Sequence, residues 1–193
     1  MRSSFGPALR FAGALFLLCV PEAPAQSGTA TVAASTDTIA PEWIHFDADA
    51  KTVQLAITAA LTHVNGGWNF NGYANGDLTI AVPLGWRVHV DFVSRDANVP
   101  HSLGIITGEP GKLPPSGDQA LSNVAFRGAY TYPFTQGLGA YKAQSFDFTA
   151  DKAGTFILYC GVPGHAASGM WDYFIVAEGL AQPVVTVKTR ANG

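Results

Sequence analysis

The sequence predicts an all-β protein, a sandwich or a barrel of about eight strands with one long irregular insertion. Aromatic residues make up 11% of the 193-residue chain and supply the bulk for a sizeable core. The 21 glycines and 12 prolines follow no fixed period, which is typical of many turns. Short segments alternate apolar and polar residues with a period of two, as half-buried strands do. An apolar share of 48% with 13% charged residues excludes a disordered chain.

The chain begins with the three parts of a secretory signal peptide. Arg2 and Arg10 precede the apolar run of residues 11–20, and the small residues 23–25 follow it. We expect residues 1–25 to be a signal peptide cleaved after Ala25, so that the mature protein is periplasmic or secreted. Because the apolar run is shorter than the ~20 residues of a membrane-spanning helix, we expect no stable membrane span after processing.

Residues 26–40 are small, polar and free of aromatic side chains, which predicts a flexible lead. We expect the folded domain over residues 41–193. Its alternation is clearest in residues 86–92, where Val88 and Val90 are flanked by His89 and Asp91. The strand candidates, separated by glycine, proline and Asn-Gly turn signals, are residues 53–57, 78–82, 86–92, 102–107, 145–149, 155–160, 173–177 and 184–188.

Residues 108–144 are rich in glycine and proline and are too long for a simple hairpin connection, which predicts an insertion. The insertion carries four aromatic residues, namely Tyr130, Tyr132, Phe134 and Tyr141. These rings either pack the insertion onto the sandwich or form part of a partner surface, and packing is the favoured interpretation.

The balance of charge argues against nucleic acid as a partner. The chain has 11 basic and 14 acidic side chains, and the basic residues form no cluster. It therefore lacks the charged surface that would neutralise a run of phosphates.

The segment most indicative of chemistry is residues 160–171, CGVPGHAASGMW. It places Cys160, His165 and Met170 with four residues between each pair. A thiolate, an imidazole and a thioether are three of the donors of a type 1 copper site, which also needs a second imidazole. The best candidate is His101, which follows a proline and precedes an apolar strand candidate.

The donor set predicts one copper ion that cycles between Cu(I) and Cu(II). One thiolate, one thioether and two imidazoles suit copper in both oxidation states, whereas a structural zinc site recruits more cysteine or histidine. Cys160 is the one cysteine left after removal of residues 1–25, so an internal disulfide is excluded.

The segments 160–171, 100–105 and 69–86 together resemble the cupredoxins, and within them the sulfocyanins; the spacing of the donors is similar to that of rusticyanin. The resemblance implies a Greek-key β-sandwich and one-electron transfer. It also implies that His101, Cys160 and His165 are equatorial copper ligands and that Met170 is the axial ligand.

The predicted function is a blue copper protein that shuttles single electrons between redox partners. An enzyme with further copper ions is disfavoured because His45, His63 and His89 form no His-x-His pair. The alternative is a copper carrier or storage protein, although such proteins often use methionine-rich or histidine-rich sites and this chain has two methionines.

We expect the redox donor and acceptor, of the kind of a cytochrome or a copper oxidase, to dock near His165. Small apolar neighbours of this residue, Val162, Pro163, Ala166 and Ala167, predict an apolar patch around an exposed imidazole edge.

One further residue and one further turn are expected to support the copper site. Ser102 stands where many cupredoxins have asparagine, and we expect it to help set a high reduction potential. The turn at residues 69–72, Asn-Phe-Asn-Gly, is expected to tie loops together near the metal.

Overall fold

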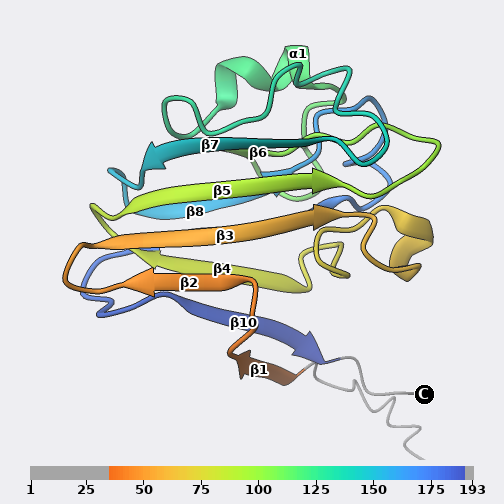
Figure 1. Ribbon diagram of the computed structural model, residues 1–193. Coiled ribbons are helices and arrows are strands. Elements are labelled where there is room, and N and C mark those ends of the chain that lie inside the picture. Colours follow the sequence, from red (N-terminus) through yellow and green to blue (C-terminus); the bar gives the residue numbers. More distant parts are fainter. Residues whose placement is uncertain (1–34, 190–193) are drawn as a thin grey trace, which may run out of the picture. The chain divides into compact units, whose positions relative to one another are not determined.

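The computed structural model describes residues 35–189 and arranges them as a two-layered β-sandwich (Figure 1). The ten strands of this part are β1 (Ser35–Ile39), β2 (Ile44–Asp47), β3 (Thr52–Ala59), β4 (Leu78–Pro83), β5 (Arg87–Ser94), β6 (Gly104–Ile106), β7 (Ala143–Thr149), β8 (Gly154–Tyr159), β9 (Trp171–Ala177) and β10 (Val184–Thr189). Three single turns of helix complete it: η1 (Val64–Gly67), α1 (Gly117–Ala120) and η2 (Leu121–Asn123). None of the helices within residues 35–189 is long and apolar enough to cross a membrane.

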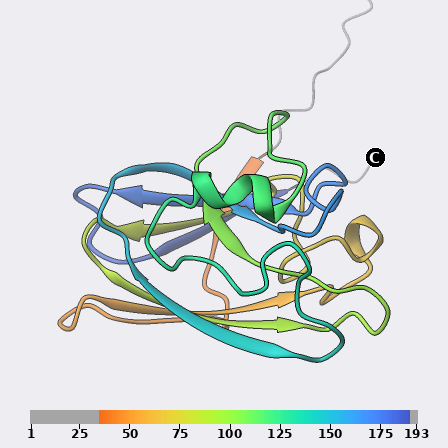
Figure 2. The same ribbon diagram turned by 90° about the horizontal axis from the view of Figure 1, so that it is seen from above.

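The two sheets are mixed, and each contains one parallel pair. The six-stranded sheet has the order β1-β10-β4-β9-β8-β6, and the four-stranded sheet has the order β2-β3-β5-β7. Strands β4 and β9 run parallel, as do β3 and β5. Figure 2 shows the two layers edge-on, with β3, β5 and β7 in the lower part of the picture and strands of the other sheet above them. The predicted all-β sandwich is therefore confirmed.

The alternation of side chains decides which face of each strand is buried. In β5, Val88, Val90 and Phe92 are at most 1% exposed, while the residues between them face outward. Such side chains from both sheets form one continuous core, which includes Cys160 and Met170. The candidate donors thus belong to the packed interior, where a side chain has few alternative positions.

The predicted flexible lead over residues 26–40 is wrong for its last residues. Strand β1 pairs antiparallel with β10, with Ile39 opposite Val185, so the folded domain begins before Pro41. The side chains of β1 are mostly exposed, and β2 is similar, so neither edge strand shows apolar alternation. The predicted signal peptide and the rest of the lead lie outside the described residues.

The predicted insertion links β6 to β7 and contains α1 and η2, with no strand of its own. It lies beside the β6 and β7 edge of the sandwich (Figure 1). Phe134 is 3% exposed and its ring contacts Tyr130 and Tyr159. Tyr132 and Tyr141 are 74% and 67% exposed. The packing interpretation is therefore correct for Phe134 and Tyr130 and wrong for the two exposed tyrosines.

Candidate metal centre

Three of the four candidate donors lie in the single loop that joins β8 to β9. Cys160 directly follows β8 and Met170 directly precedes β9, and the last pair of the antiparallel ladder holds the two ends of the loop together. The Met170 amide donates to the carbonyl of His165 at 2.9 Å, and the Cys160 amide donates to the carbonyl of Met170 at 3.3 Å. The backbone thus closes the loop into a compact ring.

The fourth donor, His101, comes from the connection between β5 and β6. Its backbone pairs with Leu138 of the insertion through two hydrogen bonds, of 3.0 and 2.7 Å. The insertion therefore holds His101 against the β8–β9 loop. Gly137 is required for this approach because its φ is +71° and a methyl group there would lie 2.9 Å from the His101 carbonyl.

The structure brings all four predicted residues together. His165 Nδ1 lies 3.4 Å from Cys160 Sγ, and His101 Nδ1 lies 3.2 Å from Met170 Sδ. Donor atoms of His101, Cys160 and His165 all lie within 4.8 Å of one another. His165 is 5% exposed and the other three residues are fully buried. Two nitrogens and two sulfurs thus converge in a pocket that excludes bulk water.

Burial tunes the ionisation of these groups. It raises the pKa of the Cys160 thiol to about 11, although amides of Ser102 and Val162 partly offset the shift. It lowers the pKa of His165 to about 4, helped by repulsion from His101, and it also lowers the pKa of His101. Both imidazoles are therefore neutral and able to bind a metal at neutral pH, while metal uptake must displace the thiol proton.

Two partners of the donors fix their orientation. Asp96 Oδ2 lies 3.3 Å from His101 Nε2, and this contact keeps the proton on Nε2 and leaves the Nδ1 lone pair free for a metal. The Ser102 amide donates to Cys160 Sγ at 3.4 Å, and Ser102 Oγ accepts from the Gly161 amide at 2.9 Å. Sequence reasoning missed Asp96, which resembles an ordinary turn residue.

Sequence reasoning also missed Trp68, whose indole packs on both imidazoles. The ring centroids of Trp68 and His165 are 4.1 Å apart, and those of Trp68 and His101 are 5.9 Å apart. The predicted tie at residues 69–72 explains its position, since the buried Asn69 donates to the carbonyls of Thr62 and Val64. Asn69 thereby closes the turn that carries Trp68.

The predicted apolar patch needs correction. His165 is 5% exposed, and Val162 and Ala166 are 9% and 6% exposed, because the loop folds back on its own backbone and against Trp68. Pro163 and Ala167 do face solvent. An acidic substitution at Ala166 would therefore disturb packing and would not report on docking alone.

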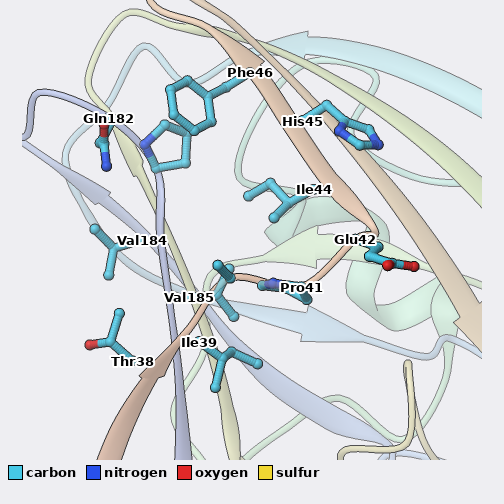
Figure 3. Close-up of a pocket in the computed structure, with 12 residues that line it drawn as sticks. Thr38, Ile39, Pro41, Glu42, Ile44, His45, Phe46, Gln182, Val184 and Val185 are labelled. Atoms are coloured by element: carbon cyan, nitrogen blue, oxygen red, sulfur yellow. The ribbon is translucent and has the colours of Figure 1, made fainter.

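The remaining histidines do not join the centre. His89 Nδ1 lies 2.9 Å from Asp147 and its Nε2 lies 3.2 Å from Asp91, on the outer face of the four-stranded sheet. His45 lines an apolar cavity of about 490 Å³ between β2 and β10 (Figure 3). The side chains of Glu42 and His45 lie at one side of this cavity, and none of the four donors lines it.

The donor set fits copper, because a soft thiolate and thioether combined with two imidazoles is the arrangement that copper prefers in both oxidation states. A β-sandwich that gathers these donors at one end is a type 1 copper protein of the cupredoxin class. The family model described as Sulfocyanin (SoxE) domain matches residues 39–187. The chain belongs to the sulfocyanin family, which consists of blue copper electron-transfer proteins.

The chain is also similar to three individual proteins. The chain is 29% identical to sulfocyanin of Sulfolobus acidocaldarius over 140 residues, which are 71% of this chain and 69% of the relative. It is 29% identical to rusticyanin of Acidithiobacillus ferridurans over 136 residues, 65% of this chain and 64% of the relative. Among solved structures, reduced auracyanin of Roseiflexus castenholzii matches with 22% identity and a TM-score of 0.47, covering 64% of this chain and 96% of that one.

Substitution of Ser102 by asparagine is expected to lower the reduction potential. Ser102 is fully buried, so a larger side chain must displace the amide that donates to Cys160 Sγ. A thiolate that loses a hydrogen bond donates more strongly to copper and favours Cu(II). Protein-film voltammetry of Ser102→Asn checks this, with the exposed Ser168→Ala on the same loop as control. An unchanged potential in Ser102→Asn would contradict the role assigned to Ser102.

Proposed function

We propose that this protein shuttles single electrons between redox partners and catalyses no reaction of its own. One copper ion would be bound by His101, Cys160 and His165 as equatorial ligands and by Met170 as the axial ligand. The observation that carries the proposal is the convergence of these four donors in a buried pocket. When bound, the copper supplies one-electron cycling between Cu(I) and Cu(II).

The chain's own contribution is to keep the donors in place through that cycle. Backbone hydrogen bonds link Cys160, His165 and Met170 to one another, and Leu138 holds His101 from the other side. A donor set that is held in this way changes little between the two oxidation states. Because the pocket excludes bulk water, little solvent has to reorganise when the charge changes.

A copper carrier is the alternative, and the burial of the donors argues against it. A carrier must give up its metal, which is easier from an exposed site than from donors that are at most 5% exposed. Four structural features resist release: the backbone ring, the Leu138 pairing, the Asp96 contact and the cover of Trp68.

Redox cycling in the presence of a copper chelator tests the proposal. The copper-loaded protein is reduced with ascorbate and reoxidised with ferricyanide, with bathocuproine disulfonate present throughout. An electron carrier keeps its copper and recovers its visible spectrum over repeated cycles. Transfer of the copper to the chelator within the first reduction would favour a carrier or storage role.

The proposal also covers the redox partners of the protein and its location. A redox donor and an acceptor, such as a cytochrome and a copper oxidase, would dock at the end of the sandwich near His165. Residues 1–25 have the pattern of a signal peptide, which supports a periplasmic or secreted location. Mass spectrometry of the exported protein would test cleavage after Ala25.

A further inference from the structure

We infer that Trp68 is the contact through which an electron passes between His165 and a redox partner, so that the indole takes the place of an exposed imidazole edge. The inference rests on the proposed electron-transfer function and concerns the route by which electrons reach the centre. Trp68 is suited to this role by the position of its ring, the rigidity of its turn and the exposed apolar side chains beside it.

The position of Trp68 makes it the outer neighbour of both imidazoles. Its ring centroid lies 4.1 Å from that of His165, closer than the 5.1 Å between the two imidazoles. His165 is 5% exposed, whereas Trp68 is only partly buried. A partner that approaches along this side therefore meets the indole before the imidazole. Electronic coupling falls steeply with distance, so a ring in van der Waals contact with the ligand is the favoured bridge.

The turn that carries Trp68 is rigid and is fastened to the metal loop. Asn65, Gly66 and Gly67 have φ values of +52°, +66° and +95°, a run of left-handed backbone that turns the chain sharply before the indole. The Asn65 side chain donates to the Trp68 carbonyl at 2.9 Å and to the Ser168 carbonyl at 2.7 Å. Figures 1 and 2 show η1 and the β8–β9 loop at the same end of the sandwich. The indole thus keeps its place relative to His165.

The surroundings indicate what kind of partner surface fits. The segments 61–76, 97–108, 128–141 and 160–170 contain no lysine, arginine, aspartate or glutamate. Two charged residues of opposite sign, Arg95 and Asp96, line a hollow beside the turn of Trp68 together with Leu61. Leu61 and Val64, on the same turn as Trp68, are 40% and 50% exposed. A redox protein with an apolar docking face complements Leu61, Val64 and Trp68, because the charges of Arg95 and Asp96 have opposite signs and favour neither sign of charge on the partner.

The step itself transfers one electron and no atoms. The reduced partner is oxidised by one electron, and the Cu(II) of this protein is reduced to Cu(I). No bond forms or breaks, no proton moves, and Trp68 conducts the electron without being oxidised itself. A second copy of this protein in the other oxidation state can act as the partner, since it presents the same apolar surface.

Electron self-exchange between reduced and oxidised copies therefore tests the inference. Both copies have the same potential, so the driving force is zero in every variant. Nuclear magnetic resonance line broadening in mixtures of the two forms gives the rate constant. Since truncation of a tryptophan at the centre of an interface commonly weakens a contact strongly, Trp68→Ala should exchange at least about tenfold more slowly than the wild type. The self-exchange rate of Trp68→Phe, which keeps an aromatic ring, should fall by a smaller factor than that of Trp68→Ala.

A matched control is Trp43→Phe, at a second partly buried tryptophan. Trp43 lies between β1 and β2, and its neighbours Glu42 and Ile44 line the cavity of Figure 3, which none of the four donors lines. The exchange rate of this variant should equal that of the wild type. A faster rate in Trp68→Ala would mean that the indole shields His165, and an unchanged rate would place Trp68 off the route. Either result would overturn the inference, as would a loss confined to Trp43→Phe.

A second readout uses the copper-free protein. If Trp68 covers His165, then Trp68→Ala should raise the rate at which diethyl pyrocarbonate modifies His165, measured by peptide mass spectrometry. An unchanged rate of modification would contradict the covering role. Failure of the proposed function can be told apart from failure of the inference. The proposed function fails if the copper-loaded wild-type protein shows no visible band or no electron self-exchange. Rapid exchange in both the wild type and Trp68→Ala fails only the inference.

Discussion

Replacement of Cys160 by serine is expected to abolish the intense visible band of the copper-loaded protein and its reversible reduction by ascorbate. The thiolate is the strongest soft donor of the set, and a serine hydroxyl neither ionises in a buried pocket nor matches the softness of sulfur. Copper affinity should fall by more than the ~100-fold that loss of an outer partner of a ligand can cost. Visible absorption and electron paramagnetic resonance spectra, before and after ascorbate, measure both effects.

The control for this variant is Ser168→Ala, an exposed position in the same loop. Its spectrum should match that of the wild type. The thermal unfolding of copper-free Cys160→Ser shows whether the sandwich is still folded. A folded Cys160→Ser protein that keeps the visible band would remove Cys160 from the ligand set and overturn the type 1 assignment.

Replacement of Phe134 by alanine is expected to destabilise the whole domain by about 3–5 kcal/mol, because it leaves a large cavity in a packed core. Phe134 is 3% exposed and packs so closely on the metal loop that a methyl group added at Gly161 would lie 2.8 Å from its ring. For a domain of this size the loss should lower the melting temperature by ~10 °C. Denaturant unfolding of the copper-free protein gives the free energy directly.

Tyr132→Ala is the matched control for Phe134→Ala, since it removes a neighbouring ring that is 74% exposed. Gln144 holds the Tyr132 backbone through its side-chain amide, and the substitution leaves those two hydrogen bonds intact. Its unfolding free energy should change by less than about 0.5 kcal/mol. Equal stability of the two variants would mean that the insertion is not part of the cooperative core.

The alternation of side chains was sufficient to predict the strands with one buried face. All eight strand candidates correspond to observed strands, from Val53, Leu55 and Ile57 in β3 to the C-terminal β10. The pattern could not reveal β1 and β2, whose exposed side chains carry no alternation. It could not reveal the parallel pairs either, since β4 and β9 are brought together by chain topology and not by local sequence.

The donor set could be predicted because three of its members share one loop with fixed spacing. His101 was predictable only through its proline and the strand after it, and the structure shows that a pairing with Leu138 holds it in place. Trp68 and Asp96 could not be found in this way. Their contacts with the imidazoles depend on how two distant turns pack against the metal loop, and neither residue has a metal-binding pattern of its own.

The division of the donors between one loop and one distant residue has a consequence for the denatured protein. Cys160, His165 and Met170 remain within eleven residues of one another when the sheets separate, whereas His101 is lost to them. An unfolded chain thus retains a three-donor chelate with appreciable affinity for Cu(I). Any ligand that binds the unfolded state stabilises the native state by less than its native affinity implies. Cu(I) should consequently raise the melting temperature less than its native dissociation constant would suggest.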